Sequence, residues 1–331
     1  MKASAVANSN IALAKYWGKR DAKLMLPHNS SISMTLDGLF SHTTCEFDGK
    51  YRSHIVILDG AELPEGDAKQ EVTIQLDVIK EMAKIKEFAK VVSNNTFPTA
   101  AGLASSASGL AALALAGSKA AGLELGKKEL SILARRGSGS ASRSVYGGFV
   151  EWQKGVKSDG SDSHAVQIAD ENYWKDFRMV VCIASKKEKK IKSRAGMAQS
   201  VATSPFYKSW IESVESDIDA LKKGILKKDL EAVGSTAEHN CLKMYATMIS
   251  TKPPIIYWNP ASMSVIHSVL ELRDNGMKCY FTCDAGPQVK IICLEKDSKE
   301  IAEMAARIEG VEDVIVSGPG RGAEFVKRDL F

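Results

Sequence analysis

Two lysines near the start of the chain, Lys15 and Lys19, lie beside Tyr16 and Trp17 and among small apolar residues. A lysine ammonium in this setting can act as a point charge on a phosphate oxygen, so the segment is a candidate wall of a phosphate pocket. The same lysines could instead belong to a solvated strand edge, with their stems lying along apolar surface. The local pattern leaves both interpretations open.

Residues 97–109 have the sequence Phe-Pro-Thr-Ala-Ala-Gly-Leu-Ala-Ser-Ser-Ala-Ser-Gly, and almost all of them are small. The apolar segment 110–117 that follows predicts a buried helix. The first amides of this helix would lack internal hydrogen-bond partners, and the positive end of its dipole would face the loop. Because both features favour an anion, phosphate is the expected ligand. The alternative is a plain helix start, capped by Ser105, Ser106 or Ser108. The loop has neither the Gly-Lys-Ser/Thr ending of a Walker loop nor a dinucleotide fingerprint.

Three further segments carry charges that could serve a site. A second small-residue loop, 137–143, ends in Arg143, which could hold a carboxylate through two hydrogen bonds or could cap a helix end. Asp284 precedes Ala-Gly-Pro; local chemistry favours a turn, although a carboxylate among small residues could also approach a substrate hydroxyl. The run 186–194 holds six positive charges and is either a solvated face or a diphosphate clamp.

The elements that must position these residues differ between the two halves of the chain. Alternation of apolar and polar residues at 26–36 predicts a strand with one buried face. The rest of the first half predicts strands at 41–47, 54–58 and 89–95 and helices at 72–88 and 127–136.

The second half predicts a different pattern. Long amphipathic helices are expected at 205–223 and 230–249. They are followed by a helix at 261–274, strands at 277–283 and 288–294, a helix at 298–308 and a strand at 314–317. With one more buried strand from the middle of the chain, 177–184, this is the arrangement of a split βαβ, ferredoxin-like layer.

Composition is that of an ordinary globular protein. The 331 residues are 44% apolar and 25% charged, and a chain of this length usually forms two domains. The net charge of +4 does not support a nucleic-acid-binding scaffold. No leader and no apolar run long enough for a bilayer is visible, so no membrane partner is expected. The six cysteines are scattered without a Cys-x-x-Cys pair, which favours buried thiols and a cytoplasmic location over disulfides or zinc.

Five segments, taken together, resemble the diphosphomevalonate decarboxylases of the GHMP kinase superfamily. They occur in order from near residue 8 to residue 287, so the resemblance covers nearly the whole chain. These segments are Asn10-Ile-Ala-Leu-Ala-Lys-Tyr-Trp-Gly-Lys-Arg-Asp21, Leu26-Pro-His-Asn-Ser-Ser-Ile-Ser33, the loop 97–109, the loop 137–143 and Asp284-Ala-Gly-Pro287.

The resemblance implies an α+β protein with the two-lobed GHMP kinase fold. The first lobe, residues 1–184, is expected to resemble ribosomal protein S5 domain 2 and to carry the ATP-phosphate loop. The second lobe, residues 185–331, is expected to be ferredoxin-like and to carry the catalytic aspartate. A homodimer is also implied.

The same resemblance implies a reaction, the ATP-dependent decarboxylation of (R)-5-diphosphomevalonate to isopentenyl diphosphate, CO2, ADP and phosphate. The 3-hydroxyl would first be phosphorylated, because hydroxide is a poor leaving group. Asp284 matches the aspartate that orients or deprotonates this hydroxyl. Lys15 matches the lysine near the transferred phosphoryl group. Arg143 matches the arginine that holds the substrate carboxylate, and Asn10 the asparagine that fixes that arginine.

Other site residues are implied in the same way. Mg²⁺ is expected with ATP, held by phosphates, water and at most one serine, since no protein metal cage is visible. His28 stands where relatives have smaller or polar residues, and could line the pocket or contact nothing. The expected substrate contacts are Tyr16, Lys19, Ser138, Ser140, Ser193 and Arg194, and the expected ATP loop is Ala101, Gly102, Leu103, Ala104, Ser105, Ser106 and Ser108.

Two alternative functions remain open at this point. One keeps the fold and changes the substrate, giving a 5-phosphomevalonate decarboxylase or a GHMP small-molecule kinase. Retention of Lys15, Arg143 and Asp284 together argues against a plain kinase. The other is a non-enzymatic sensor of nucleotide and metabolite, which loss of the aspartate or the lysine would favour.

Overall fold

Two β-sheets organise the chain, of which the computed structural model describes residues 1–97, 105–187 and 189–331. In these residues the first sheet has eight strands, in the order β14-β1-β4-β7-β5-β6, with β8 attached to β4 and β9 to β8. All pairs are antiparallel except β5 with β7. The strands are β1 (Lys2–Ala14), β4 (Ser31–Asp48), β5 (Ile55–Leu58), β6 (Ala61–Glu62), β7 (Phe88–Asn95), β8 (Phe149–Trp152), β9 (Ala165–Ala169) and β14 (Glu324–Val326).

The long strand β4 holds this sheet together, because it pairs with β1, β7 and β8. The prediction of separate strands at 26–36 and 41–47 was wrong. Gly38, with φ of 76°, adjoins a register shift between β1 and β4, so the backbone bulges and continues. The prediction of one buried face was also wrong, since residues 31–36 are buried on both faces. Helices α2 (Ser105–Ala120) and α4 (Ala141–Ser144) pack on β4, and so does α6 (Tyr207–Lys227).

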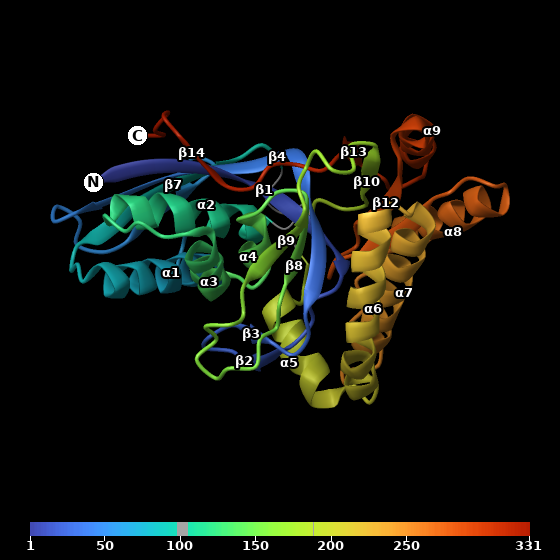
Figure 1. Cartoon of the computed structure of the whole chain (residues 1–331), viewed down its shortest axis with the longest axis horizontal. Helices are drawn as coiled ribbons and strands as arrows, with labels where there is room; N and C mark the ends of the chain where they lie inside the picture. Colours follow the sequence, from blue (N-terminus) through green and yellow to red (C-terminus); the bar gives the residue numbers. More distant parts are fainter. Residues whose placement is uncertain (98–104, 188) are drawn as a thin grey trace.

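Helices α1 to α4 cover one face of the first sheet (Figure 1). As predicted, α2 is a buried helix, and its leucines and alanines form a core with α1, α3 and the sheet. Strands β2 (Lys19–Asp21) and β3 (Leu26–Pro27) form a small hairpin separate from this sheet. The helices are α1 (Asp67–Ala83), α2 (Ser105–Ala120), α3 (Lys127–Gly137) and α4 (Ala141–Ser144).

The second sheet has the order β11-β12-β10-β13 among the residues described. Because β12 lies between β10 and β11 and is antiparallel to both, the predicted split βαβ arrangement is confirmed. Its strands are β10 (Phe177–Ile183), β11 (Tyr280–Cys283), β12 (Val289–Leu294) and β13 (Asp313–Ser317). The accompanying helices are α5 (Ser193–Thr203), α6 (Tyr207–Lys227), α7 (Leu230–Ile249), α8 (Pro260–Asp274) and α9 (Glu295–Ala306).

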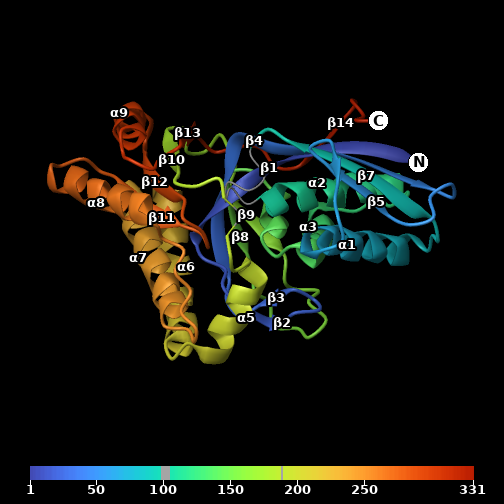
Figure 2. The same ribbon diagram turned by 180° about the vertical axis from the view of Figure 1, so that it is seen from behind.

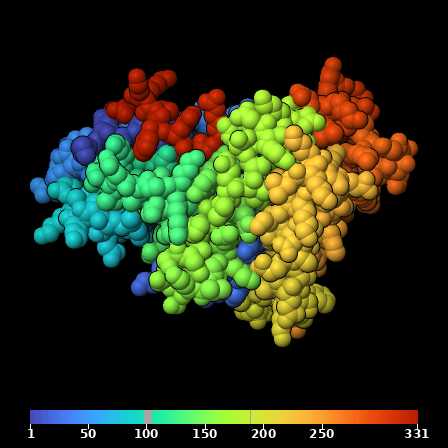
Figure 3. Space-filling model, in the orientation of Figure 1, coloured from blue at the N-terminus to red at the C-terminus, as the bar shows by residue number. Residues whose placement is uncertain are grey.

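One strand of each expected lobe belongs to the sheet of the other lobe. β10 precedes residue 184 and belongs to the second sheet, whereas β14 follows residue 185 and pairs with β1 of the first. Figure 3 shows the C-terminal tail lying along the N-terminal strand. The expected division into residues 1–184 and 185–331 therefore does not coincide with the division between the sheets. None of the helices in the described ranges is both long and apolar enough to cross a bilayer.

One apolar core joins the two sheets. It contains Ile11 and Leu13 of β1 together with Val214 of α6, and continues into the second sheet through Phe177 and Phe281. Helix α5 lies between the lobes, against β2 on one side and α7 on the other (Figure 2). The ends of β1, β11 and α5 are thereby held at the junction of the two lobes.

Helix α7 packs unusually closely on β11 at Gly234, where a Cβ atom would overlap the ring of Tyr280. We expect Gly234→Ala to lower the free energy of unfolding by about 1–3 kcal/mol, because the buried ring cannot move aside without strain. Denaturant unfolding measures this. The neighbouring exposed Ser235→Ala is the control and should change the free energy by less than ~0.5 kcal/mol; equal effects of the two variants would contradict close packing at Gly234.

Candidate active site

A cavity of about 600 Å³ lies at this junction. Its lining comes from the end of β1, the start of α1, the start of α2, the loop before α4, the start of α5 and the segment after β11. Among the residues that the structure describes, seven Lys and Arg side chains line it against three carboxylates, so it is suited to anions. The cations are Lys15, Lys19, Arg143, Lys187, Lys189, Lys192 and Arg194, and the carboxylates are Asp67, Glu71 and Asp284.

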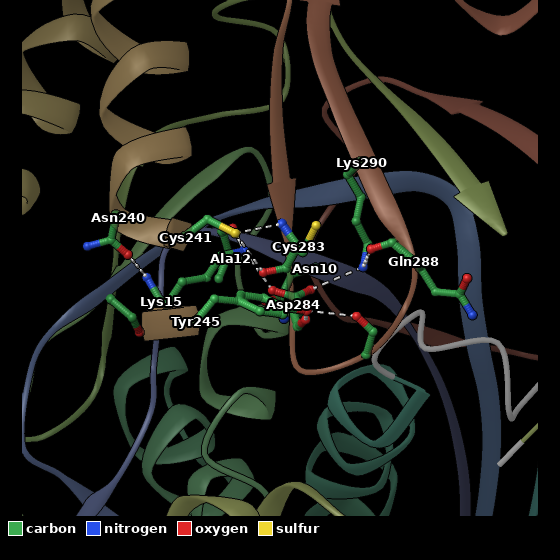
Figure 4. A network of polar contacts seen from close by, with 12 residues as sticks. Asn10, Ala12, Lys15, Asn240, Cys241, Tyr245, Cys283, Asp284, Gln288 and Lys290 are labelled. Atoms are coloured by element: carbon green, nitrogen blue, oxygen red, sulfur yellow. Dashed lines mark hydrogen bonds and ion pairs between the residues drawn. The ribbon is translucent and has the colours of Figure 1, made fainter. Parts of the chain in front are cut away.

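Asp284 follows β11 and faces Lys15, which follows β1. Lys15 Nζ lies 2.8 Å from Asp284 Oδ1 and donates a second hydrogen bond to the carbonyl of Ala12 at 2.6 Å. On the other side, Lys290 Nζ lies 3.7 Å from Asp284 Oδ2 (Figure 4). Burial raises the pKa of the Asp284 carboxyl, but Lys15 and Lys290 lower it by more, so the pKa is below its ordinary value. The carboxylate is therefore ionised at neutral pH, with 29% of its side chain exposed.

Arg143 is buried on α4 and is fixed by two neighbours. Its Nε and Nη2 donate to Asn10 Oδ1 at 3.2 and 3.0 Å, and its Nη1 donates to Ser31 Oγ at 2.6 Å. Asn10 is fixed in turn by donating to Ser144 Oγ at 2.8 Å. Burial lowers the pKa of Arg143 to about 10, so it stays charged at neutral pH. No carboxylate in the described part of the chain forms an ion pair with it.

The start of α5 and the loop before it provide a second group of cations. Lys189 Nζ donates to Ser193 Oγ and to the carbonyl of Ala285, both at 2.7 Å. Arg194 Nη2 lies 3.2 Å from Glu71 Oε1 and donates to the carbonyl of Gly137 at 3.1 Å. The Ser193 hydroxyl lies in the first turn of this helix, where unpaired amides also favour an anion.

Tyr16 and Lys19 border the same region. The Tyr16 hydroxyl is buried and has no hydrogen-bond partner among the described residues. Burial and the nearby Arg194 lower the pKa of Lys19 to about 8, and burial lowers the pKa of Lys189 to about 8. Both ammoniums would regain favourable charge interactions next to a bound anion.

The serines divide into two groups. Ser138 and Ser140 line the cavity, with their Oγ atoms 3.3 Å apart, and Ser106 Oγ lies 3.5 Å from Ser138 Oγ. Ser105 lines the cavity too. Ser108 does not, because it is fully buried and shares a hydrogen bond of 2.7 Å with Ser41 of β4. The remaining expected loop residues, Ala101, Gly102, Leu103 and Ala104, lie outside the described residues.

An apolar pocket of about 130 Å³ adjoins the cavity. The two spaces share Ala68, Glu71, Ser105 and Ser106. The other walls of the pocket come mainly from aliphatic residues of β5, α1 and α2. A polar space joined to an apolar one fits a ligand with phosphates at one end and a flat base at the other.

Several contacts of the site were missed by the sequence interpretation. Lys290 could have been found from the sequence, because it is a single lysine within the apolar run of β12. Tyr245 donates to the carbonyls of Asp284 and Gly286 at 2.7 and 2.8 Å, but nothing in the local sequence of α7 marks it. His28 neither lines the cavity nor stands alone, since its Nδ1 lies 2.7 Å from the hydroxyl of Tyr207.

The basic run 186–194 contributes to the cavity only in part. The cavity is lined by Lys187, Lys189 and Lys192. Lys186 instead forms an ion pair on the second lobe, with its Nζ 3.9 Å from Glu312 Oε2. Lys192 also forms an ion pair of 3.6 Å with Asp67 at the start of α1. The run is therefore divided between the cavity and the protein surface.

Comparison with known sequences identifies relatives over most of the chain. The profile of the diphosphomevalonate decarboxylase-like N-terminal domain matches residues 7–165, and that of the mevalonate 5-diphosphate decarboxylase C-terminal domain matches residues 179–318. The diphosphomevalonate decarboxylase of Ganoderma lucidum is 37% identical over 92% of this chain and 82% of its own length. The human diphosphomevalonate decarboxylase is 37% identical over 90% of this chain and 78% of its own length.

Solved structures give the same result. A mevalonate diphosphate decarboxylase from Enterococcus faecalis has a TM-score of 0.91 and 40% identity, with 99% of each chain covered. The enzyme from Staphylococcus aureus has a TM-score of 0.92 and 38% identity, with 98% of each chain covered. MDDEF in complex with MVAPP, AMPPCP and magnesium has a TM-score of 0.93, 40% identity and 99% coverage of each chain. The two-lobed α+β GHMP kinase fold is thus confirmed, and because the matches include every element that lines the cavity, the chain belongs to the diphosphomevalonate decarboxylase family.

Proposed function

We propose that this protein catalyses the ATP-dependent decarboxylation of (R)-5-diphosphomevalonate to isopentenyl diphosphate, CO2, ADP and phosphate, in the mevalonate pathway. The observation that carries the proposal is the convergence of Asp284, Lys15 and Arg143 on one cation-rich cavity. The family relationship supports the reaction class. MDDEF, which binds MVAPP together with the ATP analogue AMPPCP and magnesium, supports the choice of ligands.

The two ends of this substrate match two parts of the cavity. Arg143 is a buried guanidinium held in place by hydrogen bonds, which suits the substrate carboxylate. Lys19, Lys189 and Arg194 suit the 5-diphosphate, together with the Tyr16 hydroxyl, which has no hydrogen-bond partner in the described ranges. A substrate held at both ends would present its 3-hydroxyl to the carboxylate between them.

Asp284 would then act on that hydroxyl. The hydroxyl oxygen attacks the γ-phosphorus of ATP, the bond to ADP breaks, and the hydroxyl proton leaves by way of the carboxylate. Because the pKa of Asp284 is low, the group is a weak base, so orientation of the hydroxyl is its main contribution. Phosphate then departs with the C3–O bonding pair and leaves positive charge at C3, which the nearby carboxylate stabilises. The C1–C2 bonding pair moves to form the double bond as CO2 leaves.

ATP would occupy the adjoining space. Ser105 and Ser106 at the start of α2 suit its phosphates, and the apolar pocket suits its base. Lys15 would counter the negative charge of the transferred phosphoryl group. Mg²⁺ would neutralise the ATP phosphates when bound. The described residues hold no cluster of three or more His, Cys, Asp or Glu side chains, so phosphate oxygens and water would supply most of its ligands.

We also propose a cytoplasmic homodimer. All six cysteines are buried free thiols, as expected in a reducing compartment. On α7, Leu242 and Ile249 are 41% and 44% exposed on one helical face, and Ile256 nearby is 66% exposed, which suits a second copy of the chain. Light scattering at several concentrations tests the dimer.

Replacement of Asp284 by Asn should lower kcat by roughly 10²- to 10⁴-fold, because the oriented carboxylate is lost at the reacting hydroxyl. Nucleotide binding should persist, since the apolar pocket and Ser106 are unchanged. Steady-state CO2 release and ATP titration measure the two properties. Asp274→Asn, an exposed carboxamide substitution on α8, is the control. Normal turnover by the Asp284 variant would refute the proposed role.

Substrate choice is tested by supplying ATP with mevalonate, its 5-phosphate or its 5-diphosphate. We expect CO2 from the 5-diphosphate, at a kcat/KM at least about 100-fold above that of the 5-phosphate, because Lys19, Lys189 and Arg194 would hold the second phosphate. CO2 and phosphorylated products are scored separately. Higher kcat/KM for the 5-phosphate would identify a monophosphate decarboxylase, and phosphorylation without CO2 would identify a kinase.

Substrate affinity should also depend on pH. Lys19 and Lys189, each with a pKa of about 8, lose their charge as the pH rises through that value. We expect the Kd for 5-diphosphomevalonate, measured by calorimetry without ATP, to rise roughly 10- to 100-fold between about pH 7 and about pH 9. Lys189→Met should bind more weakly at pH 7 and show a shallower pH dependence. A Kd independent of pH would contradict a contribution from these lysines.

A further inference from the structure

Lys290 is a buried lysine to which the reaction described above gives no role. It lies on β12, between Thr282 of β11 and Val181 of β10, and its side chain is 1% exposed. Its Nζ has two nearby acceptors, the carbonyl of Gln288 at 3.4 Å and Asp284 Oδ2 at 3.7 Å. A buried ammonium is costly unless an opposite charge compensates it. Of the carboxylates that the structure describes, Asp284 is the one that does so.

Asp284 is therefore shared by two buried cations. Lys15, whose side chain is also 1% exposed, holds Oδ1, while Lys290 faces Oδ2 from the other side (Figure 4). Attraction at both oxygens resists rotation of the carboxylate and favours its ionised form. The backbone of Asp284 is held as well, because its carbonyl accepts a hydrogen bond of 2.7 Å from Tyr245.

We propose that Lys290 is a positioning residue for the decarboxylation: it does not touch the substrate but fixes the orientation and charge of the Asp284 carboxylate. This inference rests on the proposed role of Asp284 in the reaction. In the described part of the chain, Lys15 alone would leave Oδ2 without a cation, and the plane of the carboxylate could turn more freely about the Cβ–Cγ bond. Lys290 removes that freedom before substrate binds, so less reorganisation is needed in the transition state.

The pH dependence of kcat depends on Asp284 and Lys290 and also on the other titratable groups around them. The decrease of kcat at low pH, the acidic limb of the pH profile, would reflect protonation of Asp284. Deprotonation of Lys189, which has a pKa of about 8, contributes instead to the change of kcat at high pH. The titratable and charged groups that face the pair are Arg143 from α4, Lys189 from the loop before α5, Cys241 and Tyr245 from α7, Cys283 from β11 and Cys182 from β10.

Lys290→Met tests the proposal, because methionine has a similar length and shape but no charge. We expect kcat to fall about 10- to 100-fold, with the KM values for both substrates changing less than about threefold. The acidic limb of kcat should move to higher pH, since one of the cations that lower the pKa of Asp284 is gone. Ile292→Met, on the same face of β12 two residues further along, is the matched control and should change neither kcat nor the limb.

An unchanged kcat in Lys290→Met, or a lower kcat with an unmoved acidic limb, would overturn the proposal. Should this variant fail to fold, the pairing is measured through stability instead. Asp284→Asn leaves two buried ammoniums without a carboxylate, so its Tm should fall, and adding Lys290→Met should raise the Tm again by removing one of them. A double variant no more stable than Asp284→Asn overturns the proposal.

The results also separate this inference from the proposed function. Normal turnover by Asp284→Asn would refute the role of Asp284 itself. An inactive Asp284→Asn beside a fully active Lys290→Met would refute only the role of Lys290.

Discussion

One carboxylate shared by two buried ammoniums determines much of this site. Lys15 reaches Asp284 from the end of β1 in the first sheet, whereas Asp284 and Lys290 belong to the second. The ion pair therefore joins the two lobes as well as shaping the cavity. The two ammoniums were taken out of water at considerable cost, and neither can be left without the carboxylate. Such an arrangement holds its geometry firmly, which is what a reacting carboxylate requires.

The guanidinium of Arg143 is prepared in a different way. It lacks an ionic partner in the described residues, and neutral oxygens of Asn10 and Ser31 hold it instead. These oxygens orient the cation without neutralising it. Its charge therefore remains available to a ligand, whereas that of Lys15 is shared with the carboxylate of Asp284. The site thus combines one cation that shapes the carboxylate with another that is kept for the substrate.

Local sequence patterns predicted those features that depend on neighbouring residues. Helix α7 was predicted to the residue, and the ferredoxin-like layer followed from the order of its elements. A break was predicted between residues 36 and 41, whereas β4 continues through it, because the bulge at Gly38 depends on the pairing of β4 with β1, which spacing does not reveal. Lys290 could not be assigned a partner for the same reason: its burial beside Asp284 arises only when β12 pairs with β11. The family resemblance placed Lys15, Arg143 and Asp284, which local patterns had left ambiguous.

The cavity as a whole has an excess of positive charge, and this excess is unevenly compensated. Glu71 pairs with Arg194 and Asp284 with Lys15, but Lys19 and Lys189 have pKa values lowered to about 8, so they are held in a charged state only weakly at neutral pH. Because burial is the main cause of these lowered pKa values, a bound anion next to the two lysines would stabilise their charged form and the folded protein, and by linkage the anion gains affinity. The charge arrangement therefore favours a ligand with several negative charges over one with a single charge, independently of any contact made by the rest of the molecule.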